Sequence, residues 1–294
     1  MSYNQKEVKK TQCVALEVFK YFKKFCDEHG LTYFAIGGTC IGAVRHKGFI
    51  PWDDDIDVAM PVDDYYRFLE LGQSQIVYPF EIVNPKNIKH YHALYIKLQD
   101  ASTTFVESFI ADYPDRYSGI YLDVFPVYGL PKDRKLRNKL IRKNELLKKV
   151  NYKLRFPMRE MSTLKGKISW LGIGPFRRCV PFYWATEKQQ NLFKQIPFNS
   201  SNKVYFPWRA IPGSPGSGNY KNVFFYKDFC DTVEMPFEDT TISVPIGFDR
   251  YLTMDFGDYM KLPPKEKQTP GHPKAIIDLD TPYKYYAEKK EKSK

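Results

Sequence analysis

The acidic segment from Trp52 to Val58 holds the residues best suited to chemistry. If this segment is a strand, Asp55 and Asp57 project from one side, roughly 6 to 7 Å apart, while Ile56 and Val58 enter the core. Two carboxylates that close repel each other unless a cation or a proton lies between them, and ligands made only of oxygen suit a hard ion such as Mg²⁺. The spacing therefore predicts a divalent-metal site that would bridge substrate phosphates.

A third carboxylate is offered by Asp123, which alternates with apolar neighbours in the run at residues 119–127. If this run is a strand next to the one that carries Asp55 and Asp57, the three carboxylates meet in one small volume. A hydrogen-bonded carboxylate near a strand end is the alternative interpretation of Asp123.

A calcium-binding loop is the main competitor for the acidic segment, because Asp53, Asp55 and Asp57 match its first three ligand positions. That loop needs a glycine where Val58 stands and a glutamate at its twelfth position, where this chain has Asp64. A solvated acidic turn is the other alternative, and it leaves the glycines upstream unexplained.

Gly37 and Gly38 follow a short apolar run at residues 31–36, which we expect to be a buried strand. Glycines at such a place let the backbone approach a ligand closely. Between these glycines and the aspartates lie three basic residues, Arg45, His46 and Lys47. Arginine can grip phosphate oxygens in a bidentate fork and lysine as a point charge, although an exposed loop is the simpler interpretation of such a triplet.

The remaining periodicity predicts a mixed α and β chain. Apolar residues recur at helical spacing over residues 8–29, and Gly30 stands where a C-terminal cap is expected. A second helix should begin near Asp63 and Asp64, because acidic residues favour that end. The strands that we expect are residues 31–36, 55–60, 91–98 and 119–127.

Residues 131–180 differ from the rest of the chain, with sixteen Lys or Arg and three acidic residues. Their local balance of about +13 exceeds the +11 of the whole chain. Within them an apolar stripe lies on an otherwise basic helix: Leu136, Leu140, Leu147, Val150 and Leu154. An aromatic stretch follows at residues 168–184. A basic face over an ordinary core is the alternative to a binding surface.

These patterns predict an α+β fold, in which a mixed sheet is flanked by helices and carries a basic helical insertion. We assign the catalytic domain to residues 1–130 and 226–280. Residues 131–225 would be the basic, aromatic-rich insertion, which binds either the acceptor substrate of a transfer reaction or a membrane surface. Residues 281–294 would be a solvated tail.

Composition narrows the class of protein only in part. Of the 294 residues, 43% are hydrophobic, which excludes an unstructured chain. The net charge of +11 allows nucleic acid, an anionic membrane or a phosphate-rich substrate as partner. The five cysteines are scattered without a CxxC pair, so neither a disulfide framework nor a zinc site is indicated. No apolar stretch suits a signal peptide or a spanning helix, and we expect a cytoplasmic protein.

Three ordered blocks resemble the LicD family, which includes relatives of fukutin and fukutin-related protein within the nucleotidyltransferase fold. The blocks are the segments Gly37 to Pro61, Tyr121 to Gly129, and Phe237 to Pro264. The resemblance implies transfer of a phosphorylated alcohol to a sugar of a cell-surface polysaccharide, lipopolysaccharide, teichoic acid or lipid-linked glycan precursor. The typical donor is CDP-choline, and related members use CDP-ribitol.

By position, the resemblance implies that Asp55 and Asp57 are the metal-binding pair and Asp123 the third carboxylate, holding Mg²⁺ or Mn²⁺. It makes Gly37, Gly38 and Thr39 the turn that approaches the nucleotide. Arg45, His46 and Lys47 would lie at the diphosphate. Two departures stand out: Cys40 replaces a usual aliphatic residue, and His272 is single where a pair is expected, which weakens a general-base role for it.

The mechanism that follows is a hypothesis. One or two metal ions neutralise the diphosphate, a sugar hydroxyl attacks the phosphorus that bears the alcohol, and CMP leaves. One alternative is a nucleotidyltransferase that makes a CDP-activated compound or acts on RNA. Basic and aromatic residues are not clearly interleaved on one surface, so we expect no nucleic-acid partner. A non-catalytic glycan-binding module is the alternative from another class.

Overall fold

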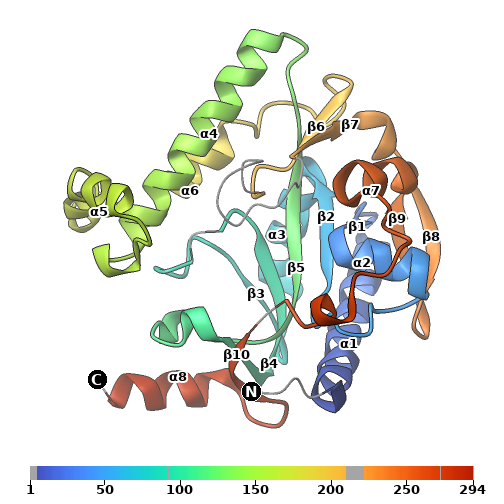
Figure 1. The fold of residues 1–294 in the computed structure, drawn as a ribbon, viewed down its shortest axis with the longest axis horizontal. Coiled ribbons are helices and arrows are strands. Elements are labelled where there is room, and N and C mark those ends of the chain that lie inside the picture. Colours follow the sequence, from blue (N-terminus) through green and yellow to red (C-terminus); the bar gives the residue numbers. More distant parts are fainter. Residues whose placement is uncertain (1–4, 92, 210–221, 272, 294) are drawn as a thin grey trace.

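The structure is a computed structural model that describes residues 5–91, 93–209, 222–271 and 273–293. Within these ranges the chain forms eight α-helices and ten strands. A curled mixed sheet with helices packed around it occupies the centre, and a helical arm projects to one side (Figure 1). The predicted α+β fold is confirmed.

The main sheet has the strand order β1-β2-β5-β4-β10, and β3 pairs with the first part of β4, residues 97–100. The strands are β1 Phe34–Ala35, β2 Asp57–Pro61, β3 Phe80–Val83, β4 Ile96–Glu107, β5 Ser118–Gly129 and β10 Lys274–Asp278. β2 and β5 run parallel, whereas β1–β2, β4–β5, β3–β4 and β10–β4 are antiparallel. The parallel pair lies at the middle of the sheet.

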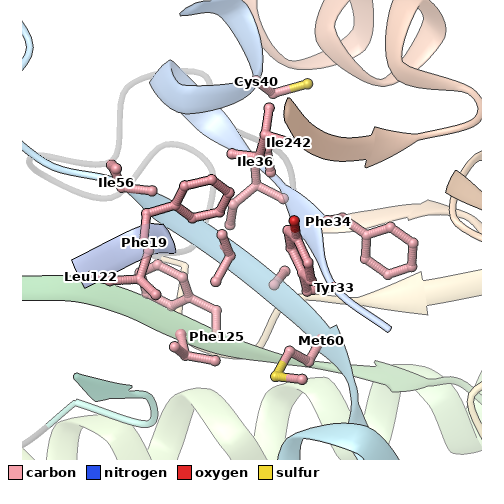
Figure 2. Packing of buried hydrophobic residues seen from close by; sticks show 14 of the residues in the cluster. Phe19, Tyr33, Phe34, Ile36, Cys40, Ile56, Met60, Leu122, Phe125 and Ile242 are labelled. Carbon is pink, nitrogen blue, oxygen red and sulfur yellow. The ribbon is translucent and has the colours of Figure 1, made fainter. Parts of the chain in front are cut away.

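Helix α1, Gln5–His29, packs its apolar face on this sheet. The helix ends at Gly30, whose φ of +58° allows the Leu31 amide to donate to the Cys26 carbonyl over 2.9 Å. This is the expected glycine cap. Figure 2 shows how Phe19 of α1, Tyr33 beside β1 and Met60 of β2 share one core.

The strand bounds differ from the expected ones. β1 covers only the end of the run at residues 31–36, and β2 begins at Asp57 instead of at residue 55. β4 starts at Ile96 rather than at residue 91 and is twelve residues long. β5 continues past Pro126 to Gly129, because β2 ends beside it and β6 takes over the pairing. Helix α3, Val62–Gln75, begins where the acidic residues predicted it.

The expected insertion contains α4 Arg134–Arg155, α5 Leu164–Leu171 and α6 Trp184–Asn191. Its later part returns to the sheet, since β6 Lys203–Tyr205 pairs with the end of β5 and with β7 Val223–Phe225. Of the predicted apolar stripe, Leu147 and Leu154 are buried but Leu136 is exposed.

A polar network, rather than that stripe alone, attaches α4. The guanidinium of buried Arg155 donates to the Pro85, Ile88 and Lys89 carbonyls and to the Thr186 hydroxyl of α6. Five donor groups on one planar side chain can satisfy several carbonyls at once. This hydrogen-bond network could not be predicted from the sequence, because its partners are distant along the chain.

The C-terminal part adds a hairpin and two helices: β8 Thr232–Phe237, β9 Thr240–Pro245, α7 Phe248–Phe256 and α8 Tyr283–Lys292. Phe237 of the hairpin meets Phe19 of α1 edge to face. The segment predicted as a solvated tail forms α8, whose Tyr283 and Tyr286 pack on a cluster beneath β4 while its lysines face solvent. None of the helices in the described ranges is both long and apolar enough to cross a membrane.

Candidate active site

The glycine turn joins β1 to helix α2, Gly37–Ile41, which continues into a π-helical turn, Gly42–His46. Gly37 has a φ of +56°, and its amide donates to the Tyr251 hydroxyl oxygen of α7 over 2.9 Å. The Asp57 amide donates to the Thr39 hydroxyl oxygen over 2.8 Å. The turn is therefore fixed to the first residue of β2 and to a helix from the other end of the chain.

Two carboxylates lie directly against this turn. A Cβ on Gly37 would be 3.5 Å from an Asp57 carboxylate oxygen, and a Cβ on Gly38 would overlap the Asp53 carboxylate. Gly38 thus leaves the space that the Asp53 carboxylate occupies, and the Asp57 carboxylate lies in contact range of Gly37. That this turn approaches a ligand stays a prediction.

The centre of the site is one row of the sheet. The parallel ladder pairs Asp57 with Asp123, and the antiparallel ladder pairs Asp123 with Lys97 on β4. Side chains paired in a ladder point to the same face, about 5 Å apart from strand to strand. The Lys97 ammonium is 3.4 Å from an Asp123 oxygen, and both side chains are buried. We call Asp57, Asp123 and Lys97 the charged row.

Asp55 does not alternate with Asp57 along one strand, as the sequence analysis expected. The ladder with β5 begins only at Asp57, and the preceding loop is held by the Gln12 side chain of α1, which donates to the Ile50 and Asp53 carbonyls over 3.2 and 2.7 Å. In this loop the carboxylate oxygens of Asp53, Asp54 and Asp55 lie within 4.8 Å of one another.

Buried Asp54 is tied to the far edge of the sheet. The Lys274 ammonium of β10 is 3.0 Å from its carboxylate. This contact stabilises an acidic loop that repulsion between neighbouring carboxylates would otherwise open.

The predicted carboxylates affect the pKa values of two buried tyrosines, Tyr95 and Tyr121. Burial raises the pKa of Tyr121 well above its ordinary value, and the charges of Glu107, Asp123 and Asp55 raise it further. Burial likewise raises the pKa of Tyr95, with Asp123 and Asp57 among the charges that add to it. The charge of Asp123 therefore acts on both tyrosines, together with Asp55 at Tyr121 and Asp57 at Tyr95.

The three basic residues Arg45, His46 and Lys47 differ in their contacts: the first two are hydrogen-bonded within the protein, and the third faces solvent. Arg45 donates from Nη1 to the Tyr259 carbonyl, and from Nε to the His46 Nε2 atom over 2.9 Å. Burial, and then the charge of Arg45, lower the pKa of His46, which favours the neutral ring. Because Nε2 accepts from Arg45, the neutral ring would carry its proton on Nδ1. Lys47 is exposed.

Glu238, in the turn of the β8–β9 hairpin, positions the loop that follows the triplet. Its carboxylate accepts from the Phe49 amide over 3.0 Å, and its own amide donates to the Lys47 carbonyl over 2.9 Å. Gly48 leaves the room for this carboxylate, which a Cβ would overlap.

Cys40 lies wholly in the core beneath the turn (Figure 2). Burial raises the pKa of its thiol, so the side chain stays neutral and packs as a small apolar group, like the aliphatic residue that we expected there. His272, the other departure, lies outside the described residues.

Residues 30–169 match the family model described as "LicD/FKTN/FKRP, nucleotidyltransferase domain". The chain is also 31% identical over 267 residues to the lipopolysaccharide cholinephosphotransferase LicD of Haemophilus influenzae, covering 90% of this chain and 96% of that protein. The chain belongs to the LicD family. A shorter match, 31% over 87 residues, joins it to an uncharacterised protein of Rickettsia prowazekii, with 28% of this chain and 31% of that one covered.

The acidic side chains of the site have the chemistry that a divalent metal ion requires. The acidic loop brings carboxylate oxygens of Asp53, Asp54 and Asp55 within 4.8 Å of one another, and the charged row sets Asp57 beside Asp123 on the adjacent strand. Among the described residues, neither set includes a His or Cys group. Carboxylate donors without nitrogen or sulfur suit Mg²⁺ or Mn²⁺. The residues present fit such an ion, with the Lys97 ammonium offsetting part of the local negative charge.

Four residues that contact the candidate site were not predicted from the sequence: Lys97, Lys274, Tyr251 and Glu238. Lys97 stood in an apolar run that was expected to be a strand, so a charged residue there was the available signal. The other three contact the site from segments far along the chain, and only the folded structure brings them near.

The contact between Gly37 and Asp57 gives a prediction with a matched control. Gly30→Ala and Gly37→Ala both force alanine to a φ near +57°, which costs about 1 to 2 kcal/mol in either variant. Gly30 has nothing near its Cβ position, whereas a Cβ at Gly37 would touch the Asp57 carboxylate oxygen at 3.5 Å, an ordinary van der Waals contact, and would occupy space beside it that a bound ion needs. Both variants should melt at lower temperature, but only Gly37→Ala should also lose most of the rise in melting temperature that Mg²⁺ produces in wild type. Equal Mg²⁺ stabilisation of the two variants would contradict this account.

Proposed function

We propose that this protein transfers a phosphorylated alcohol from a CDP-alcohol to a sugar of a lipopolysaccharide or related cell-surface glycan and releases CMP. Phosphocholine from CDP-choline is the first candidate, because the Haemophilus relative is named a lipopolysaccharide cholinephosphotransferase and is similar along nearly its whole length. The observation that carries the proposal is the charged row, packed against a glycine turn.

The residues would share the work as follows. Asp57, Asp123 and Asp55 would hold Mg²⁺ or Mn²⁺, which when bound neutralises charge on the diphosphate oxygens. The sugar hydroxyl oxygen forms a bond to the phosphorus that bears the alcohol, and the bond from that phosphorus to the CMP oxygen breaks. A carboxylate of the site accepts the hydroxyl proton.

Basic groups on both sides would orient the diphosphate. Lys97 brings a buried ammonium to the charged row. From the loop after α2, neutral His46 can donate through its Nδ1 proton and Lys47 can act as a point charge. Arg45 donates from Nη1 to the Tyr259 and Lys261 carbonyls of the C-terminal segment. It would therefore bind phosphate only through its remaining N–H groups.

A pocket beside the charged row supports a glycan acceptor. Tyr95 and Phe125 stand two residues beyond Lys97 and Asp123 on the same strands or their extension, and therefore face the same side. Phe125 stacks on Trp208 at 3.9 Å between ring centroids and contacts Tyr95 at 4.3 Å. The adjoining cavity, of about 390 Å³, is lined by Tyr95, Trp208, Phe109, Arg116 and Lys148, among others.

Two buried donors in this pocket lack hydrogen-bond partners among the described residues: Trp208 Nε1 and Arg116 Nε. Unsatisfied buried donors in a cavity indicate a place for a polar ligand. An aromatic wall with such donors suits a sugar ring that carries hydroxyl or anionic groups. Arg116 gives the pocket a positive charge, while the charge of Lys148 is offset by Glu145 at 3.4 Å. The Arg116 charge disfavours a choline headgroup, which supports the acceptor as the occupant.

The expected peripheral contact with an anionic membrane is part of this proposal, because a lipid-linked acceptor would be presented at a membrane surface. The alternative nucleotidyltransferase would use the same carboxylates and a CTP-like donor, and it would release pyrophosphate instead of CMP. A glycan-binding module would need no cluster of carboxylates at a glycine turn, so the charged row disfavours it.

CMP release from CDP-choline, with lipopolysaccharide as acceptor, tests the proposal. Asp57→Asn should lower Mg²⁺-dependent release by roughly a hundredfold or more, since a preorganised charge at the reacting phosphate is lost. Asp63→Asn, which alters an exposed aspartate of α3, should leave the rate unchanged. EDTA should abolish release in both active proteins, and CDP-ribitol in place of CDP-choline identifies the alcohol.

Full activity in Asp57→Asn would contradict the assigned site. Pyrophosphate release from CTP, without CMP release from any CDP-alcohol, would support the nucleotidyltransferase instead.

The pocket predicts a separate kinetic result. Trp208→Ala should raise KM for the acceptor about tenfold, as expected for loss of a stacking platform, and leave KM for CDP-choline near the wild-type value. Trp184→Ala, at a partly exposed position of α6, is the matched control and should change neither constant. A raised KM for CDP-choline alone would assign the pocket to the donor.

A further inference from the structure

Helix α5 presents an apolar face to solvent. Leu164, Ile168 and Leu171 are 75%, 61% and 61% exposed, and their spacing of four and three residues places them on one side of the helix. Phe176, in the 3₁₀ turn Gly174–Arg178 that follows, is 59% exposed. We call these four residues the α5 patch. The helix lies at the outer end of the helical arm, at the left edge of Figure 1.

This face is not the one by which α5 attaches to the protein. Trp170 donates from Nε1 to the Phe156 carbonyl over 3.0 Å and packs with Tyr113, Phe156 and Met161. Gly174 leaves the room for the Trp170 ring, which any Cβ there would overlap. The attachment fixes the orientation of the helix, so the α5 patch is held outward.

Exposed cations flank the patch: Lys165, Lys167, Arg177 and Arg178. Residues 161–186 contain no Asp or Glu. The nearest acidic residue before them, Glu160, accepts from the Tyr113 hydroxyl over 2.6 Å and is 3.3 Å from Arg159. The surface therefore combines apolar side chains with uncompensated positive charge.

We propose that the α5 patch rests on an anionic membrane surface, with its apolar side chains at the level of the acyl chains and its cations at the headgroups. Apolar residues on one face and basic residues beside them are what an interfacial helix requires. The positive charge matches anionic lipids and favours them over a neutral apolar partner. Lipid binding is measured without substrates, so the proposal stands or fails independently of the proposed reaction.

Co-flotation with phosphatidylcholine vesicles, with and without phosphatidylglycerol, tests this. Wild type should float with the vesicles that contain phosphatidylglycerol and be released by high salt. The double variant Ile168→Glu with Leu171→Glu should bind at least tenfold more weakly, because two carboxylates replace the apolar contact. Arg177→Ser should weaken binding about fivefold. Val77→Glu, which puts one such carboxylate on a 69% exposed valine after α3, should bind as wild type does.

Circular dichroism checks that the double variant is folded, and Leu164→Ser provides a milder change at the same surface. The proposal is overturned if wild type does not float with vesicles that contain phosphatidylglycerol or floats equally with pure phosphatidylcholine. It is also overturned if the Ile168→Glu, Leu171→Glu double variant and the Leu164→Ser variant both bind vesicles as wild type does. A further contrary result is that wild type is a dimer and these variants are monomers, because this would assign the face to a second copy of the chain.

Discussion

The repulsion between Asp57 and Asp123 is the constraint on which the rest of the site depends. A parallel ladder sets these two carboxylates opposite each other on adjacent strands, on one face of the sheet. The sheet fixes the spacing of their backbones at about 5 Å, so the two carboxylates stay near each other on this face. Such an arrangement persists only where cations compensate it.

The surrounding residues can be understood as that compensation. Lys97 completes the row on the third strand, and Lys274 binds the neighbouring acidic loop through Asp54. The glycine turn adds no side chain of its own at the site, and Tyr251 and Glu238 hold the segments on either side of it. Segments from both ends of the chain thus converge on a small group of acidic residues, leaving an aromatic pocket along the same face.

The sequence predicted which residues come together better than it predicted where the strands begin. Asp57 and Asp123 are paired on adjacent strands, and Gly37 and Gly38 lie against Asp57 and Asp53, because each stands next to a strand whose apolar pattern is visible. The predicted start of β2 at residue 55 was wrong, because the acidic loop is held by Gln12 of the distant helix α1 and not by strand pairing. Lys274 and Tyr251 could not be predicted, because a contact across more than two hundred residues leaves no local pattern. Likewise, α8 has a charged sequence typical of a tail, and only the cluster beneath β4 gives its two tyrosines a place to pack.

Direct measurement of metal binding tests the central claim, that the charged row holds a divalent ion. Mn²⁺ titration followed by electron paramagnetic resonance, in the presence of CDP-choline, would compare wild type with Asp123→Asn and with Asp231→Asn at an exposed loop. The account predicts that wild type and Asp231→Asn bind Mn²⁺ with the same affinity and that Asp123→Asn binds about tenfold or more weakly. Equal affinity in all three proteins, or no binding by wild type, would contradict it.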